Sequence, residues 1–328
     1  MRGSIGPTSP PDGAPEPPPN GSPAFAAAPG VERATHRIIE NGAGGCLLRE
    51  RRIPLIARHG RYGLGAALRA DPRRLALAAD DEALADLDLR RAAFVDTETT
   101  GLAGGAGTYV FLVGVGRAVG EDLVVRQYCM RDHRDEAALL TAVVEELDRD
   151  VDGLVTFNGM MFDVPRLRGR LAACRLDAAL PDRRHLDLCI VGRRLWRAKY
   201  PSGRLATLEA GEAGVRRLDD LPGAACPGAW FSFVRGEPSE IDRVFRHNLH
   251  DVLSLVVLAG RAAAAPIPDD VVPCREHAIA ASRPRERSPA SRPITRPLAE
   301  AVRELERRRR DARGPGAPGP RAFPRSGA

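Results

Sequence analysis

Residues 92–116 read AAFVDTETTGLAGGAGTYVFLVGVG, a short apolar run followed by acids, a glycine-rich connection and a second apolar run. The run at 92–95 predicts a buried strand that ends at Asp96, and the Val- and Leu-rich segment at 109–115 predicts a second strand. Glu98 follows Asp96 at i+2. Because successive side chains of a strand point to opposite faces, both carboxylates are expected on one side of the chain.

The sequence after this stretch alternates between strand and helix patterns. Strands are predicted at 123–128 and 154–157, with an amphipathic helix at about 135–147 between them. Further helices are predicted from about Asp163 and over residues 187–196, 205–210 and 238–260. Three consecutive strands followed by helix, strand and helices predict the α/β class with a mixed sheet.

Composition divides the chain into four parts. Residues 1–35 are predicted to be disordered, because the first 30 residues contain 9 Pro and 5 Gly and few apolar side chains. Residues 36–90 are predicted to form a small extension packed on the main domain, which spans 91–263. Residues 264–328 form a Pro/Arg-rich tail, with a short helix predicted at 298–310.

Positive charge is concentrated in the tail. The chain carries a formal charge of +6, while residues 261–328 alone contain 15 Arg and 8 acidic residues. The part of the chain before residue 261 is therefore close to neutral. The tail could hold a phosphate backbone electrostatically, or it could be only a solvated end.

The cysteines and the apolar segments indicate the compartment. Six cysteines are present without a C-x-x-C pair, so we expect neither a zinc site nor a disulfide framework. No apolar run reaches 18 residues, and the N-terminus lacks the basic and apolar regions of a secretory signal. The expected location is the reducing cytoplasm, with no contact to a membrane.

Two further acidic residues occupy positions where a charged side chain is unusual. Asp163 follows the segment TFNGMMF at 156–162 and opens a predicted helix, and Asp251 lies beside the apolar stripe of the longest predicted helix. Converging carboxylates repel one another unless cations compensate, and oxygen ligands suit Mg²⁺ or Mn²⁺. Two such ions can activate a water and stabilise the leaving oxygen of a phosphodiester. Taken singly, Asp96 could only cap a turn, and Asp163 could be an ordinary acid at a helix start.

Three motifs together resemble those of the DEDD exonuclease superfamily: Asp96-x-Glu98, FNGMMFD ending at Asp163, and HNLHD ending at Asp251. The segments DTETTGLAGGAGTYVFLVGVG, HLDL and RRLW resemble, more closely, the predicted RNase H-like exonucleases of the YprB type. The resemblance covers about residues 92–259. It implies an RNase H-like fold with a five-stranded mixed sheet flanked by helices. It also implies hydrolysis of nucleic acid, with these four acids binding two Mg²⁺ or Mn²⁺ ions.

A histidine stands where much of this superfamily has a tyrosine. His247 precedes Asp251 by four residues, and on a helix this spacing places both side chains on one face. An imidazole with a near-neutral pKa can take a proton from the attacking water, which would make His247 a catalytic base. Alternatively, His247 only forms a hydrogen bond with a ligand carboxylate.

The resemblance also implies contacts with the substrate. In related exonucleases the T-G-L stretch lies against the terminal nucleotide, so Thr97, Thr100 and Leu102 are expected to contact it. Asn158 could orient the site or only form a turn, and Asp187 could support the site or be structural. The leading hypothesis is a 3′–5′ exonuclease that acts on single-stranded DNA or RNA ends. The alternatives are a structure-selective endonuclease and a non-catalytic nucleic-acid-binding module.

Overall fold

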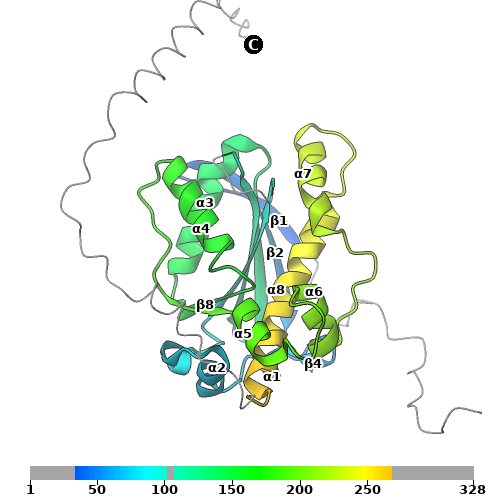
Figure 1. The fold of residues 1–328 in the computed structure, drawn as a ribbon. Helices are drawn as coiled ribbons and strands as arrows, with labels where there is room; N and C mark the ends of the chain where they lie inside the picture. The colour runs from blue at the N-terminus through cyan, green and yellow to red at the C-terminus, as the bar shows by residue number, and fades with distance from the viewer. Residues whose placement is uncertain (1–33, 102–106, 268–328) are drawn as a thin grey trace, which may run out of the picture. The chain divides into compact units, whose positions relative to one another are not determined.

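A seven-stranded mixed sheet forms the centre of the molecule in a computed structural model, which describes residues 34–101 and 107–267 (Figure 1). The strands lie in the order β1-β2-β7-β6-β5-β8-β9. Their bounds are β1 Thr35–Asn41, β2 Gly44–Pro54, β5 Ala93–Thr99, β6 Val110–Val119, β7 Asp122–Cys129, β8 Gly153–Thr156 and β9 Arg184–Asp187. A separate short hairpin consists of β3 (Arg58–His59) and β4 (Tyr62–Gly63).

Strand direction changes in the middle of the sheet. β5, β6 and β7 form an antiparallel meander, which β2 and β1 continue on one side, also antiparallel. On the other side β8 pairs parallel with β5, and β9 pairs parallel with β8. Parallel neighbours need a crossover connection, and helices supply it before β8 and before β9.

The α/β class and the mixed sheet are confirmed, but the expected count of five strands is wrong. β1 and β2 extend the sheet, and both precede residues 92–259, the segment that carries the family resemblance. β2 pairs with β7 and buries Cys46, Leu48 and Ile53. Its strand pattern is hidden in the sequence because residues 49–52 read RERR. These charges are accommodated across the sheet, where Arg126 of β7 donates to Glu50 at 2.8 Å.

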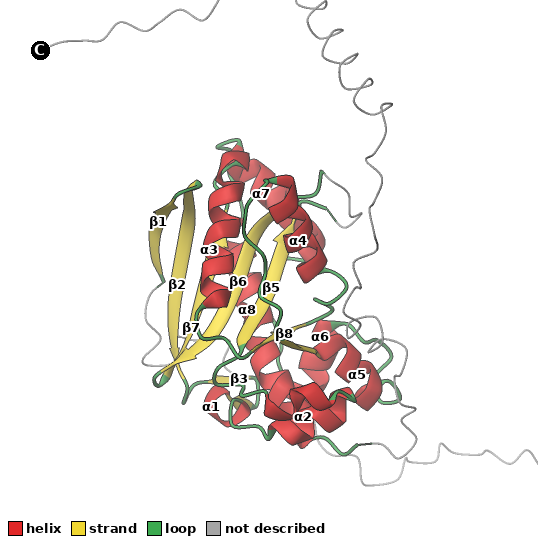
Figure 2. Ribbon diagram, turned by 90° about the vertical axis from the view of Figure 1, so that its left-hand side faces the viewer, coloured by secondary structure: helices red, strands yellow, loops and turns green. Residues whose placement is uncertain are grey.

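Helices cover both faces of the sheet. α3 and α4 lie on one face, while α8 crosses the other face and packs with α1, α2 and α5 (Figure 2). The bounds are α1 Leu64–Ala67, α2 Pro72–Ala79, α3 Glu136–Asp148, α4 Asp163–Ala173, α5 Leu188–Trp196, α6 Leu205–Leu208, α7 Cys226–Val234 and α8 Ile241–Ala264. 3₁₀ turns lie at Glu82–Asp86, His133–Asp135 and Gly223–Ala225, and a π-helical turn lies at Glu209–Ala213.

One helix bound differs from its prediction for a local reason. The segment from 187 was expected to be helical, but the chain first forms strand β9, which ends at Asp187. The Asp187 side chain then accepts a hydrogen bond from the Cys189 backbone N–H and caps α5. Four residues of strand are too few to carry a clear period-2 pattern in the sequence.

Two glycines of β6 allow α8 to approach the sheet closely. A Cβ atom on Gly114 would lie 2.2 Å from Asn248 Oδ1, and one on Gly116 would lie 2.6 Å from Val252 Cγ1. Any side chain at either position would push α8 away from the strand. The close approach lets Asn248 Nδ2 donate to Asp96 Oδ2 at 2.8 Å, so these glycines help to build the site.

Several predictions fall outside the described residues. They are the disorder of the N-terminal segment, the basic tail with its short helix, and the substrate contact of Leu102. Within residues 34–101 and 107–267, no helix combines the length and the apolar character needed to cross a lipid bilayer.

Candidate active site

Three carboxylates gather between β5 and α8; two of them are buried and Asp96 is half-buried. Asp96 and Glu98 come from β5, Asp251 comes from α8, and one oxygen of each lies within 4.8 Å of the other two. Glu98 and Asp251 are each only 8% exposed. The i, i+2 spacing of a strand accounts for the first two, since both face α8.

The fourth acid, Asp163, lies next to this group, but it is not part of the set whose oxygens lie within 4.8 Å of one another. Asp163 is the first residue of α4, is 6% exposed, and accepts a hydrogen bond from the Thr97 hydroxyl. Its charge still reaches the group, because Asp163 is one of the neighbours that raise the pKa of Asp96. The structure thus brings three of the four acids together and places the fourth next to them.

Burial and neighbouring negative charges raise the pKa values of Asp96, Glu98 and Asp163 and so favour their protonated forms. Burial is the main cause of the raised pKa of Asp96, followed by the charges of Asp251 and Glu98. Burial likewise raises the pKa of Glu98 to about 8 and that of Asp163 to about 6. Without a cation the site therefore retains protons, and a bound cation would replace them.

The metal-free protein is expected to lose stability as pH rises from about 7 to about 8.5. In this window the folded state still holds protons on Glu98 and His247, whose pKa values are raised to about 8 and about 9, whereas the unfolded chain has released them. Each group lowers the free energy of unfolding by at most about 1.4 kcal/mol per pH unit. The buried His59 and His250 do not interfere, because burial lowers their pKa values to about 3 and about 4.

Thermal melts in EDTA across this pH range check this expectation. The melting temperature should fall with pH, and the fall should be shallower in Glu98→Gln. Added Mg²⁺ should raise the melting temperature more at the high end of the range, because it replaces the protons. A melting temperature that stays constant from about pH 7 to about 8.5 contradicts the expectation.

An arginine supplies positive charge to the carboxylate group. Arg217 lies between the π-helical turn and α7, and its side chain is 10% exposed. Its Nη2 donates to Asp251 Oδ1 at 2.5 Å and to Glu209 Oε2 at 2.7 Å. Glu209 opens the π-helical turn, and such turns are frequent at functional sites. Arg217 holds Asp251 in place by this pair of contacts.

His247 is fixed by a carboxylate on one side and faces the acidic group on the other. Its Nδ1 lies 2.9 Å from Asp220 Oδ2, while its Nε2 lies 3.4 Å from Asp251 Oδ2 and 4.0 Å from Glu98 Oε1. Burial alone would lower the pKa of His247. The hydrogen bond to Asp220 and the charges of Asp251 and Glu98 outweigh burial and raise it to about 9.

The loop before α4 is held by Asp187. This side chain accepts hydrogen bonds from the backbone N–H groups of Asn158 at 2.7 Å and Met160 at 3.1 Å. Asn158 has a φ of +64°, a left-handed conformation that asparagine tolerates better than most residues. Two roles were considered for Asn158, orienting the site and forming a turn. The turn explains its left-handed backbone conformation. Asp187 positions the loop that leads to Asp163.

A cavity of about 650 Å³ opens from this group along α5 and α6. Asp96, Thr97 and Asp163 line one end, next to Asn158. The rest of the wall combines basic and aromatic side chains with smaller residues. The basic and aromatic residues are Arg193, Arg197, Arg204, Phe157, Phe162, Trp196 and Tyr200.

Thr100 lies apart from this cavity. Its hydroxyl accepts a hydrogen bond from the Tyr109 backbone N–H at 3.0 Å, and its own N–H donates to the Tyr109 carbonyl at the same distance. These contacts close the connection between β5 and β6 at its base. The residue thus has a structural role, and its contact with a substrate stays a prediction.

The sequence interpretation missed three side chains that complete the site: Arg217, Asp220 and Cys226. The Cys226 Sγ atom lies within 4.8 Å of a Glu98 carboxylate oxygen. All three lie in or next to the connection between the π-helical turn and α7, which has no periodic pattern. Asn248, within the HNLHD motif, was quoted but given no role. It now holds Asp96 and accepts from Gln127 Nε2 at 2.8 Å.

Residues 93–263 match the family model described as the RNase_H superfamily, which is more than half of the chain. The chain therefore belongs to the RNase_H superfamily. It is also similar to the Uncharacterized protein YprB of Bacillus subtilis (strain 168), with 36% identity over 222 residues. The match covers 65% of this chain and 52% of YprB, so the chain spans about half the length of that relative. The resemblance to YprB-type RNase H-like proteins is confirmed.

A solved structure also matches part of the chain. It is the family B DNA polymerase from the hyperthermophilic archaeon Pyrobaculum calidifontis, with 19% identity and a TM-score of 0.41. The match covers 53% of this chain and 27% of the polymerase.

Proposed function

We propose that the protein is a divalent-metal-dependent nuclease of the DEDD type that removes nucleotides from single-stranded 3′ ends. The observation that carries this proposal is the group of Asp96, Glu98 and Asp251, of which Asp96 lines a basic and aromatic cavity together with Asp163. Nucleases of this superfamily generally use divalent metal ions. Beyond a metal-dependent nuclease, the proposal includes a preference for single-stranded ends, cleavage in the 3′–5′ direction and the use of two metal ions.

The donor atoms of the site fit such ions. Three buried or half-buried carboxylates within 4.8 Å of one another offer the hard oxygen ligands that Mg²⁺ and Mn²⁺ prefer. We assign Asp96, Glu98 and Asp251 as ligands, with Asp163 joining them from α4. A bound pair of ions supplies an activated water and stabilises the charge on the leaving oxygen.

The remaining residues of the site orient these groups and can hold or move a proton. Asn248 fixes Asp96 from α8, and Arg217 fixes Asp251. Asp220 fixes the ring of His247, so that Nε2 faces Glu98 and Asp251. Nε2 is therefore the atom at which a proton can be held, or accepted from the attacking water once cations compensate the carboxylates.

The cavity fits one strand of nucleic acid. Its volume of about 650 Å³ is that of a site for a small ligand, typically about 300–1,000 Å³, which is too little for a duplex. Arg193, Arg197 and Arg204 are exposed, and none forms an ion pair within the described part of the chain. Free guanidinium groups bind phosphates, and the aromatic residues offer faces on which bases stack.

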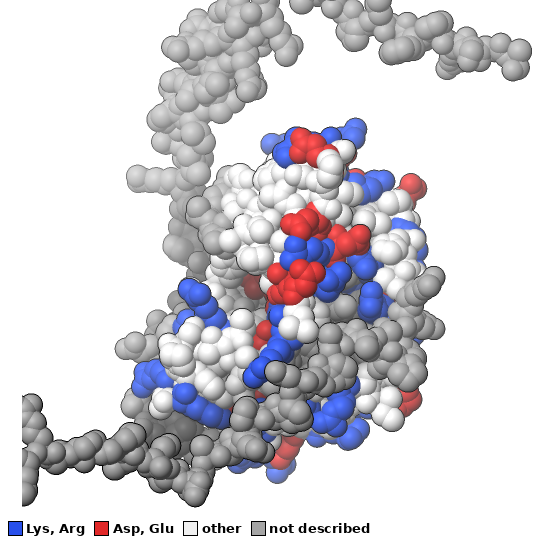
Figure 3. Space-filling model, turned by 90° about the vertical axis from the view of Figure 1, so that its right-hand side faces the viewer, with Lys and Arg blue, Asp and Glu red and all other residues white. Residues whose placement is uncertain are grey.

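The face shown in Figure 3 carries charges of both signs. Basic and acidic side chains lie interspersed on it. This agrees with the nearly neutral charge of the chain before residue 261. Substrate contacts are thus expected from the arginines of the cavity rather than from a broad basic surface.

The test uses the full chain with substrates labelled at the 5′ or the 3′ end, as single- and double-stranded DNA and RNA, with Mg²⁺ or Mn²⁺. We expect 5′-labelled single strands to shorten stepwise from the 3′ end and 3′ label to appear at once as mononucleotide. Discrete internal cuts would replace the proposal with a structure-selective endonuclease. Binding without cleavage under either metal would replace it with a binding module.

Replacing Arg193, Arg197 and Arg204 together with alanine is expected to weaken binding of single strands and to leave the cleavage step intact. Each lost phosphate contact should lower the slope of log Kd against log salt concentration by about 0.7. The matched control is Arg37→Ala, because Arg37 is exposed on edge strand β1 at the other end of the strand order. An unchanged salt slope in the triple variant would remove the cavity from the substrate path.

A further inference from the structure

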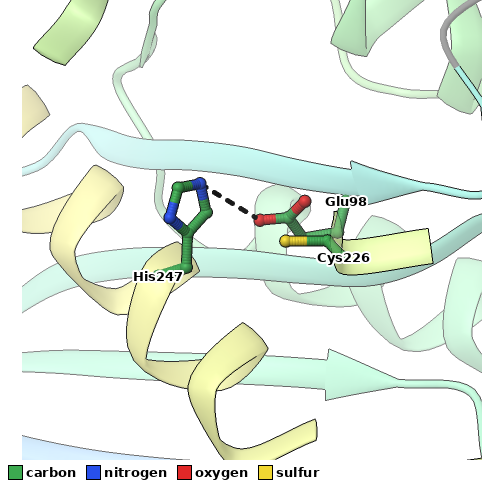
Figure 4. A group of neighbouring side chains, drawn as sticks. All are labelled: Glu98, Cys226 and His247. Atoms are coloured by element: carbon green, nitrogen blue, oxygen red, sulfur yellow. Dashed lines mark ion pairs between the residues drawn. The ribbon is translucent and has the colours of Figure 1, made fainter. Parts of the chain in front are cut away.

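A second set of metal-binding atoms overlaps the carboxylate group. The Cys226 Sγ atom, a ring nitrogen of His247 and a carboxylate oxygen of Glu98 all lie within 4.8 Å of one another. The three side chains come from α7, α8 and β5 and point towards a common centre (Figure 4). A thiol, an imidazole and a carboxylate form a donor set of mixed softness, unlike the three oxygen donors next to it.

Packing holds the cysteine in place. Cys226 is the first residue of α7 and is fully buried. Trp230, one turn further on, stacks on Phe111 with ring centroids 5.1 Å apart and donates from Nε1 to the Met130 carbonyl at 2.8 Å. Because this tryptophan fixes α7 on the sheet, the Cys226 sulfur stays next to the Glu98 carboxylate.

The histidine has the outer contact that is typical of a metal ligand. Imidazoles that bind a metal through one nitrogen usually donate the other N–H to a carboxylate, which fixes the tautomer and the ring orientation. Asp220 Oδ2 lies 2.9 Å from His247 Nδ1, and this leaves Nε2 for the ion. The dashed line in Figure 4 marks the ion pair of 4.0 Å between His247 Nε2 and Glu98 Oε1. An ion between them would draw both atoms closer.

We propose that Glu98, Cys226 and His247 form a Zn²⁺ site, and that Zn²⁺ bound there inhibits the nuclease. Zinc accepts thiolate, imidazole and carboxylate ligands together, whereas Mg²⁺ takes oxygen ligands. When the ion binds, the protons held by the Cys226 thiol, by His247 Nε2 and by the Glu98 carboxyl group leave to solvent, and the sulfur coordinates as thiolate. The fourth position is open to water or to Asp251, whose Oδ2 lies 3.4 Å from His247 Nε2.

Inhibition follows from the shared residues and rests on the proposed nuclease function. Glu98 belongs to both sets of donors. A zinc ion bound by Glu98, Cys226 and His247 therefore removes Glu98 from the Mg²⁺ site. The same ion occupies the lone pair of His247 Nε2, which the proposed reaction needs. The absence of a C-x-x-C pair predicted no zinc site, because that expectation considered only ligands that are close in sequence.

Binding is tested with Co²⁺, which takes the place of Zn²⁺ and is coloured. We expect the metal-free full chain to develop a thiolate-to-cobalt charge-transfer band with Co²⁺ and to lose it when Zn²⁺ is added. The band should be absent in Cys226→Ser and Cys226→Ala and present in Cys189→Ser. Cys189 is a matched control, being buried near the site but outside the donor set. Circular dichroism melts verify that each variant is folded.

The contact between Asp220 and His247 allows an independent test of the proposed Zn²⁺ site. Asp220→Asn should weaken Zn²⁺ binding by roughly 10- to 100-fold, the usual effect of removing the carboxylate behind a histidine ligand. A band that persists in both Cys226 variants, or the lack of any band in the wild-type chain, overturns the site. None of these readouts depends on cleavage, so they remain decisive if the nuclease proposal fails.

The inhibitory effect is measured on Mg²⁺-dependent cleavage. Micromolar Zn²⁺ should inhibit the wild-type chain, and Cys226→Ser should need at least about tenfold more Zn²⁺ for the same inhibition. Inhibition is expressed for each protein relative to its own rate without Zn²⁺, so that a change in the basal rate of Cys226→Ser does not affect the comparison. Equal inhibition of wild type and Cys226→Ser would show that Zn²⁺ acts at the three carboxylates instead, which overturns the inhibitory role of this site.

Discussion

Replacing Asp96 with asparagine is expected to lower divalent-dependent cleavage by about 10³-fold or more. A bound metal contributes several kcal/mol of charge stabilisation in the transition state, and each 1.4 kcal/mol corresponds to about tenfold in rate. Asp96 is the central residue of the site, because Asp251, Glu98 and Asp163 all act on its pKa. Glu98→Gln, Asp163→Asn and Asp251→Asn are expected to reduce cleavage by a similar factor.

The substitutions at Asp96, Glu98 and Asp163 should not destabilise the metal-free protein. Asp251→Asn is outside this expectation, because it also removes the ion pair with Arg217. An amide has nearly the shape of the carboxyl group it replaces, and it removes one charge from a group whose members repel one another. Melting temperatures in EDTA at about pH 8 should therefore stay constant or rise, while the increase caused by Mg²⁺ should disappear.

The control for this experiment is Glu145→Gln, since Glu145 is an exposed acid on α3, away from the site. It should keep both the activity and the metal response of the wild type. A folded Asp96→Asn protein that cleaves at the wild-type rate under saturating Mg²⁺ would refute its assignment as a ligand. The other three acids are judged separately by the same criterion.

Replacing His247 with alanine should lower the rate of cleavage by roughly 10²- to 10⁴-fold, the usual contribution of a positioned acid or base. Metal affinity should change much less, because the carboxylates remain. The measurement is a single-turnover rate with saturating substrate and Mg²⁺, together with Mg²⁺ titration by melting temperature. Full activity of His247→Ala would leave this residue without a part in the reaction.

His247→Tyr separates proton transfer from orientation. A phenol with a pKa near 10 cannot accept a proton at neutral pH, but it can form a hydrogen bond with the attacking water. Activity restored by tyrosine would mean that the position works by orientation.

Asp220→Asn tests the contact behind the ring. The substitution should lower the rate of cleavage by roughly 10- to 100-fold if His247 must be held in one tautomer. The Asp220 Oδ2 to His247 Nδ1 distance of 2.9 Å supports this expectation. Wild-type rates in Asp220→Asn would mean that the ring keeps its orientation without this contact.

The features that the sequence determined by itself are those with a local period. The apolar run before Asp96 marks a buried strand, and the i, i+2 spacing places Glu98 on the same side. The 3.6-residue period of α8 buries Asp251 beside an apolar stripe and puts His247 one turn away. Chain geometry within one element decides these relations, so they can be read without knowing the rest of the fold.

Tertiary structure alone decided the surroundings of these residues. Arg217, Asp220 and Cys226 lie in or next to an irregular connection, and their contacts with α8 and β5 span 21 residues or more of sequence. No periodic pattern encodes a contact between an irregular segment and a distant helix. The seven-strand count has the same cause, since the charged centre of β2 is compatible with a strand only because Arg126 of β7 pairs with Glu50.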